Sequence, residues 1–149
     1  MGEKAVERML TLFDRWDSKA NGRIHILFGP MGPDFVSQET LSRVFELAKK
    51  RNTRVHLHVA QGDRETAQMM QRYGKRTIPW LEEQGFLDQS LIAVHLTDAT
   101  DQETQTVAQS GASMILCSNS IGIIDGVVPP AKVFQDAGGI VGLGSDQAP

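Results

Sequence analysis

The chain has 149 residues, which is enough to bury one hydrophobic core, and its 40% hydrophobic and 22% charged residues are ordinary for a globular domain. A net charge of −3 without any basic stripe argues against nucleic acid as a partner. No apolar run approaches the roughly 20 residues that span a bilayer, and the N-terminal stretch MGEKAVERML lacks the apolar core of a targeting peptide, so neither a membrane nor a secretory role is expected.

Hydrophobic periodicity predicts two helices and one strand in the first third of the chain. Residues 3–17 carry apolar side chains at helical spacing with charges between them. The run Ile24–Phe28 predicts a short strand that ends at the sequence GPMGPD. Ser37 is the expected N-cap of a second helix, whose apolar side carries Leu41, Val44, Phe45 and Ala48.

The alternation of helices and strands continues to the end of the chain. Strands are expected at Val55–Ala60, Leu91–His95, Ser113–Cys117 and Ile140–Gly144, and helices at about 63–73, 77–85, 101–110 and 130–137, with a loop rich in Gly and Ile after the third of these strands. Short apolar strands that alternate with helices form a parallel sheet covered by helices. Two architectures fit: a doubly wound open sheet, or part of a (βα)8 barrel. GPMGPD lacks GxGxxG spacing, which argues against a nucleotide-binding fold.

Three of the expected strand ends carry a side chain that can bind a metal ion. They are His58, His95 and Asp146, and chemistry in parallel α/β folds collects at this end of the sheet. Two imidazoles and a carboxylate make a normal Zn²⁺ ligand set that leaves a position open for water. The structural alternatives are hydrogen-bonded core histidines and a helix N-cap aspartate. His56 and His25 lie deeper in their strands, and we expect both to be structural.

The last strand offers a reason for the position of its aspartate. Gly142 and Gly144 share the side-chain parity of Asp146 and are expected to leave space beneath it. A metal ion beside the carboxylate would stabilise its negative charge. Asp146 could then accept a proton from an attacking water, which makes it the candidate general base.

Five short motifs lie at the expected strand ends, in a fixed order. They read GPMGP at 29–33, HLHVAQ at 56–61, HLTD at 95–98, CSNS at 117–120 and GSD at 144–146. This series resembles the amidohydrolase superfamily of metal-dependent hydrolases. The resemblance is closest to its branch of cytosine-, guanine- and adenosylhomocysteine-type deaminases and triazine hydrolases. It implies an α/β fold of about five βα units, strands 4 to 8 of a (βα)8 barrel, with residues 1–149 as one partial domain.

The resemblance also implies roles for individual residues. His58, His95 and Asp146 would bind one divalent ion, zinc or iron, with Asp146 as proton acceptor and His95 binding or orienting the water. Met31 and Gln61 are implied substrate contacts, but Met31 stands where a histidine is usual and Gln61 where a glutamate carries a proton to the ring nitrogen. An amide is no general acid near neutral pH. We therefore expect hydrolysis of a cyclic amidine, triazine, urea-like or amide substrate rather than purine or cytosine deamination.

The family's first strand supplies an H-x-H metal pair, whereas the H-x-H of this sequence, His56 to His58, lies on the strand that corresponds to strand 5. We therefore expect a segment of a longer hydrolase, inactive by itself, whose first and last strands need the remaining barrel strands or a second chain, possibilities that include a homo-oligomer. The single cysteine, Cys117, cannot form an internal disulfide, which favours a reducing cytoplasm. Two alternatives stay open: a homologue that binds a small ligand without metal or catalysis, and an independent flavodoxin-like binding domain.

Overall fold

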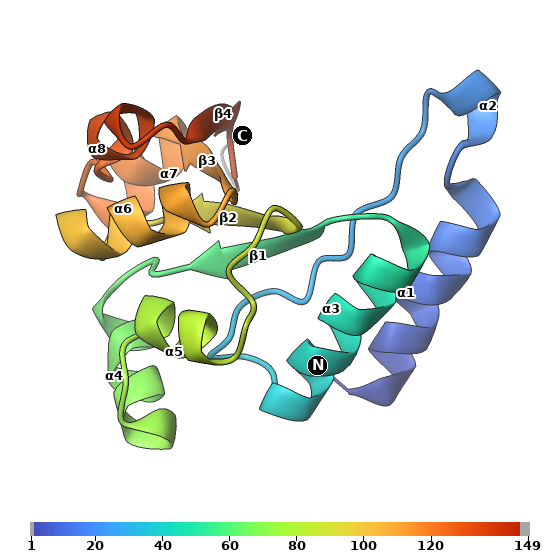
Figure 1. Ribbon diagram of the computed structural model, residues 1–149, viewed down its shortest axis with the longest axis horizontal. Coiled ribbons are helices and arrows are strands. Elements are labelled where there is room, and N and C mark those ends of the chain that lie inside the picture. The colour runs from blue at the N-terminus through green and yellow to red at the C-terminus, as the bar shows by residue number, and fades with distance from the viewer. Residues whose placement is uncertain (1, 147–149) are drawn as a thin grey trace.

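Four parallel strands form a single sheet in a computed structural model that describes residues 2–146, apart from the side chains of residues 124 and 125 (Figure 1). The strands are β1 (Val55–Val59), β2 (Leu91–His95), β3 (Ser113–Cys117) and β4 (Ile140–Gly144). They lie in the order β1-β2-β3-β4. Each strand thus pairs with the next one in the chain, and right-handed crossovers taken repeatedly in one direction place all the helices on one face. This is the wall of a barrel and not a doubly wound sheet.

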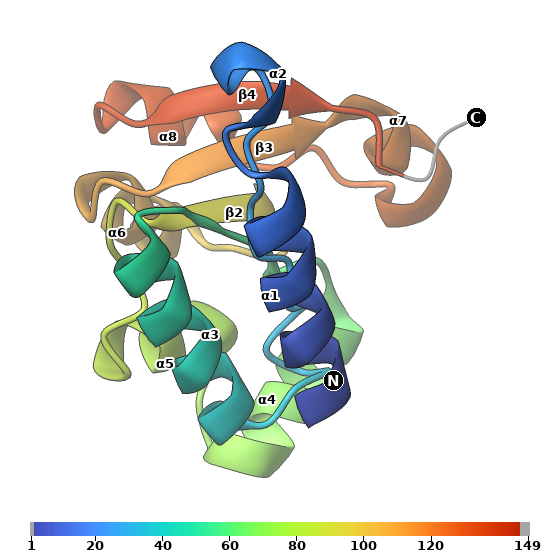
Figure 2. The same ribbon diagram turned by 90° about the vertical axis from the view of Figure 1, so that its right-hand side faces the viewer.

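Helices fill the connections between these strands, as the periodicity predicts. Their bounds are α1 Glu3–Trp16, α2 Lys19–Gly22, α3 Gln38–Arg51, α4 Asp63–Tyr73, α5 Thr77–Glu83, α6 Asp101–Gln109, α7 Ser118–Ser120, the π-helical turn η1 Ile121–Asp125, and α8 Ala131–Asp136. Helix α3 packs on β1, α6 on β3, and α8 on β3 and β4. Figure 2 shows α1 beside α3, away from the carboxyl end of β4. The turns α7 and η1 replace the loop expected after β3.

The strand expected at Ile24–Phe28 is the main correction to the predicted elements. This segment is extended, but only Phe28 pairs, through an isolated parallel bridge to Val55. Its N–H donates to the Arg54 carbonyl (3.0 Å) and its carbonyl accepts from the His56 N–H (2.8 Å). The following Gly29-Pro30 ends the pairing, because proline has no N–H to donate. The segment therefore follows the free edge of β1 without forming a continuous ladder.

Burial is greatest in β2 and falls from there towards β4. Every residue of β2 is buried, and β1 alternates between buried and half-buried positions. In β4, Ile140 is 73% exposed and Leu143 is 82% exposed, and β3 is the only partner of this strand among the described residues. Strand β4 is thus an open edge of the kind that pairs with further strands. Within residues 2–146, no helix combines the length and the hydropathy needed to cross a membrane.

Candidate metal centre

The three predicted metal-binding side chains meet at the carboxyl end of the sheet. One ligand atom from each of His58, His95 and Asp146 lies within 4.8 Å of the other two. His58 is the penultimate residue of β1, His95 ends β2, and Asp146 follows β4. The rings of His58 and His95 stack with their centroids 5.2 Å apart and their planes at 19°. The structure therefore brings together donors from three separate strands, as the sequence analysis expects.

An irregular backbone turns His95 towards this group. The strand register pairs His95 with Val59, whose side chain is fully buried, whereas His58 points to the opposite face. A regular strand would send His95 to the side of Val59, because paired residues of parallel strands share a face. His95 instead has φ +80° and Leu96 has φ +60°. These two left-handed residues break the alternation, so the His95 ring stacks on His58 while Leu96 enters the core.

Left-handed backbone is a recurring property of these strand ends. Besides His95 and Leu96, it occurs at Met31 (φ +73°), Ala60 (φ +50°) and Asp146 (φ +55°). Aspartate tolerates this conformation, but the other side chains are disfavoured there by roughly 1–3 kcal/mol each. Such conformations persist only where neighbouring contacts hold them, and they cluster at functional sites.

A backbone carbonyl fixes the orientation and the tautomer of His58. The Met31 carbonyl lies 2.7 Å from His58 Nδ1 and also accepts from the His58 backbone N–H at 2.8 Å. A carbonyl oxygen only accepts, so the ring proton is on Nδ1 and the lone pair is on Nε2. The Met31 side chain is 50% exposed. Position 31 therefore orients the candidate ligand through its main chain and leaves its side chain free at the rim.

The space expected beneath Asp146 is filled by its neighbouring strand, which corrects the interpretation of the two glycines. A Cβ at Gly142 would lie 3.0 Å from Cδ1 of Ile115, and one at Gly144 would lie 2.9 Å from Cγ2 of the same side chain. The lack of a side chain at both glycines therefore leaves room for the Ile115 side chain of β3. Asp146 itself is exposed at the end of the strand.

The two remaining histidines lie outside the three-residue group. The ring of His56 is 6.4 Å from that of His58, edge to face, and burial, followed by the neighbouring His58, lowers the pKa of His56. His25 is not in a strand: its side chain is 71% exposed and its Nδ1 is 4.0 Å from Asp17 Oδ1. His25 is therefore not a strand residue, contrary to the sequence-based expectation.

Gln61 lines an open groove of about 590 Å³ formed by the segments that follow His58 and His95, although neither histidine lines it. The other lining residues are Gly62, Asp63, Arg64, Glu65, Thr97, Asp98 and Val127. The backbone of Gln61 is anchored on both sides: its N–H donates to Glu65 Oε2 (2.9 Å) and its carbonyl accepts from Thr97 Oγ1 (2.5 Å). Glu65 is 3% exposed. Burial raises the pKa of its carboxyl group, although the hydrogen bonds that this group accepts act to lower it.

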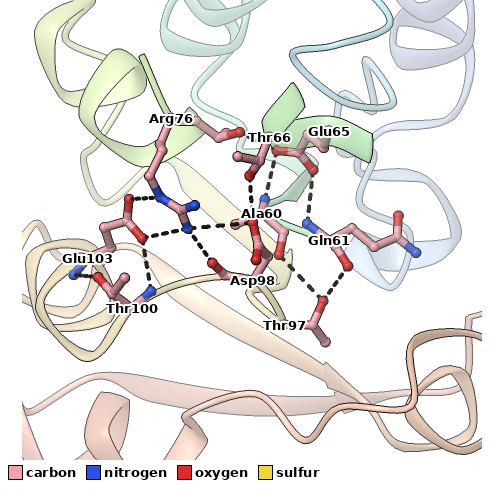
Figure 3. Close-up of polar contacts among 10 residues, drawn as sticks. Ala60, Gln61, Glu65, Thr66, Arg76, Thr97, Asp98, Thr100 and Glu103 are labelled. Atoms are coloured by element: carbon pink, nitrogen blue, oxygen red, sulfur yellow. Dashed lines mark hydrogen bonds and ion pairs between the residues drawn. The ribbon is translucent and has the colours of Figure 1, made fainter. Parts of the chain in front are cut away.

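A charged network that the sequence analysis did not find lies beside this groove (Figure 3). The Arg76 guanidinium makes a two-pronged contact with Glu103, Nε to Oε1 at 2.8 Å and an Nη to Oε2 at 3.1 Å. Glu103 also forms a capping box with Thr100 at the start of α6. The pattern Thr100-x-x-Glu103 is a sequence signature of that box and could have revealed Glu103. Nothing local in the sequence indicates its partner Arg76.

The variant Glu103→Gln tests the strength of this network through its pH dependence. Burial acts to raise the pKa of Glu103, but hydrogen bonds from Arg76 and Thr100 outweigh it and hold the pKa below its ordinary 4.5. A depressed pKa stabilises the fold above the unfolded value and loses this effect as pH falls through the folded value. We expect Glu103→Gln to reduce the free energy of unfolding by about 1–3 kcal/mol at pH 7, and by progressively less below pH 4.5.

Urea denaturation of the full-length protein across this pH range measures the difference. Glu83→Gln is the matched control, because Glu83 is 52% exposed in its pair with Lys75 and exposed pairs contribute little. A loss that is independent of pH would show that the Glu103 charge does not stabilise the fold.

A parallel βα wall with polar side chains gathered at the carboxyl ends of its strands defines a segment of a barrel whose active site lies at that end. The chain belongs to the amidohydrolase family, whose sequence pattern matches residues 2–149. It is 30% identical over 145 residues to the 5-methylthioadenosine/S-adenosylhomocysteine deaminase of Desulfitobacterium hafniense, covering 97% of this chain and 34% of that protein. It is 33% identical to the enzyme of the same name from Carboxydothermus hydrogenoformans, covering 99% of this chain and 34% of that protein.

Solved structures agree with this assignment. An adenosine deaminase from Xanthomonas campestris with bound zinc superimposes with a TM-score of 0.88 at 29% identity, covering 96% of this chain and 32% of that one. The atrazine chlorohydrolase of Arthrobacter aurescens TC1 complexed with zinc has the same fold, with a TM-score of 0.87 at 21% identity over 96% of this chain and 32% of that one. The chain thus spans about a third of the length of the proteins that it matches.

Proposed function

We propose that the full-length protein is a metal-dependent hydrolase that cleaves C–N bonds other than peptide bonds in a small molecule. The observation that carries the proposal is the convergence of His58, His95 and Asp146, with ligand atoms within 4.8 Å of one another. The family assignment and the deaminase relatives support the reaction class. Residues 1–149 are proposed to be one partial domain, completed by the remaining barrel strands.

The donor set suits one divalent ion, zinc or iron. Two imidazoles and a carboxylate are normal zinc ligands, and the carbonyl of Met31 leaves Nε2 of His58 as the available donor. Tetrahedral zinc with bonds of about 2.1 Å separates its ligands by about 3.4 Å. A spread of up to 4.8 Å therefore requires small side-chain rotations, or a water between His95 and the ion.

The roles of this chain's residues follow from their places. When bound, the ion would activate water and polarise the substrate. Asp146 accepts the proton of the attacking water, and His95 orients that water towards the substrate carbon. Gln61, at the groove, donates an amide hydrogen bond to the substrate but supplies no proton. This favours a triazine, urea-like, cyclic amidine or amide substrate over a purine or cytosine whose ring nitrogen must be protonated.

We also propose a cellular location and partners for the protein. Cys117 is buried and is the only cysteine of the sequence, which suits a reducing cytoplasm. The open edge of β4 suits the remaining strands of the same protein first, and a second copy next. The segment by itself is proposed to be inactive.

Metal analysis of the full-length protein together with a substrate panel tests the proposal. We expect about one divalent ion per chain, and hydrolysis of at least one triazine, urea-like or amide compound. His58→Ala should lose both the ion and the turnover, because it removes the donor that Met31 orients. The matched control is His25→Ala, which removes an exposed histidine away from the site and should change neither. A metal-free protein that binds such compounds without turnover would favour the non-catalytic alternative.

A further inference from the structure

The loops that follow β1 and β2 are joined by hydrogen bonds from the backbone and from the Thr97 side chain. The Leu96 N–H donates to the Val59 carbonyl (3.0 Å), and the Asp98 N–H donates to the Ala60 carbonyl (2.8 Å). Thr97 Oγ1 donates to the Gln61 carbonyl (2.5 Å). The HLTD motif at 95–98 therefore ties the end of β2, which carries the candidate ligand His95, to the loop that carries Gln61.

Asp98 connects these joined loops to helix α4 and to Arg76. Its Oδ2 accepts from Thr66 Oγ1 of α4 at 2.5 Å and lies 3.5 Å from an Nη of Arg76. Arg76 also donates to the Asp98 backbone carbonyl. The contact between Arg76 and Glu103, a side chain that is only 11% exposed, fixes the guanidinium in turn. One arginine thus connects the second loop to the start of α6.

The residue after Arg76 holds the first loop. Thr77 Oγ1 donates to Glu65 Oε1 (2.5 Å), and the same carboxylate accepts from the Ala60 N–H (2.8 Å) and the Gln61 N–H (2.9 Å). Both loops contain left-handed residues, Ala60 in one and His95 with Leu96 in the other. Strained backbone of this kind relaxes unless its surroundings over-determine it. Arg76 (Figure 3) and the next residue, Thr77, supply that constraint to both loops at the start of α5.

We propose that Arg76 and Asp98 are positioning residues, which hold the left-handed end of β2 so that His95 faces His58 and not the side of Val59. The inference rests on the proposed function, since it assigns these residues to the same metal centre. Neither residue reaches a reacting atom in this arrangement. Their effect passes through the backbone of residues 95–98.

The full-length, metal-loaded protein provides the test. The double variant Arg76→Met/Glu103→Gln removes both charges of this pair, so the Glu103 carboxylate is not left buried without its cation. We expect about tenfold weaker zinc binding in chelator competition and about tenfold lower kcat, with KM within about twofold, as for other residues that orient ligands indirectly. Arg76→Lys should be intermediate, because an ammonium can pair with Glu103 without also reaching the Asp98 carbonyl. The control Arg43→Met removes an exposed arginine paired with Glu3 and should change none of these values.

Hydrogen exchange of the metal-free protein distinguishes a failure of the positioning role from a failure of the proposed function. We expect the amides of Leu96 and Asp98 to exchange about tenfold faster in the double variant than in the wild type. A lower melting temperature with unchanged exchange and unchanged zinc affinity would show a merely structural role and overturn the inference. A wild-type protein without zinc or turnover would overturn the proposed function instead, and exchange at residues 95–98 would then decide the positioning role alone.

Discussion

Replacement of Asp146 by asparagine is expected to lower kcat of the full-length protein by about a thousandfold, with a smaller loss of metal affinity. The amide cannot accept the proton of the attacking water, and a positioned general base contributes about 10²- to 10⁴-fold. Asparagine matches aspartate in size and tolerates φ +55° as well as aspartate does. The variant therefore removes the basic oxygen without disturbing the end of β4. Steady-state kinetics and metal analysis on the same preparation measure the two losses.

The control for this variant is Asp136→Asn. Asp136 is an exposed aspartate in an i,i+4 pair with Lys132 on α8, away from the strand ends. It should retain wild-type kinetics. If Asp146→Asn kept a kcat within tenfold of the wild type, another residue would have to accept the proton, and the role assigned to Asp146 would be wrong.

Gly139→Ala is expected to reduce the free energy of unfolding by about 3 kcal/mol, at the upper end of the usual cost of overpacking. A Cβ at this position would overlap the ring of Phe134 at Cε1 and Cδ1 and lie 2.9 Å from the Phe134 carbonyl. Phe134 is fully buried, so its ring cannot move away without disturbing the core. The required shift would pass into β4, which carries Asp146. Urea denaturation of the full-length protein measures the loss.

Gly122→Ala makes the same change in open space. No atom lies within 4 Å of a Cβ built at Gly122, so this variant should stay within about 0.5 kcal/mol of the wild type. Equal effects of the two substitutions would mean that backbone entropy, and not the contact with Phe134, accounts for the result at Gly139.

Local patterns in the sequence were sufficient for most of the fold. The strand predicted at Leu91–His95 has the observed bounds, and Ser37 accepts from the Thr40 N–H at the start of α3 as expected. These features depend on nearby residues, namely on apolar periodicity and on capping. That His58, His95 and Asp146 would lie at one edge of the sheet was also predictable, because parallel strands bring their carboxyl ends together.

The features that the sequence could not reveal depend on contacts between distant segments. Strand parity alone places His95 on the wrong face, and only its left-handed backbone, held by the following loop, corrects this. The glycines of β4 indicated empty space, whereas Ile115 from the neighbouring strand occupies it. The partner of Glu103 lies 27 positions away at Arg76. A hydrophobic pattern carries no information about any of these pairings.

The contact between Met31 and His58 has a consequence for the evolution of this protein. The acceptor at Nδ1 is a main-chain oxygen, which every amino acid supplies, so the identity of residue 31 is not constrained by this bond. In the function that we propose, its half-exposed side chain can therefore vary with the compound that is recognised, among residues that tolerate φ +73°, while the imidazole keeps its tautomer. Under the same proposal, selection could diversify the specificity at this position without a penalty in cation affinity.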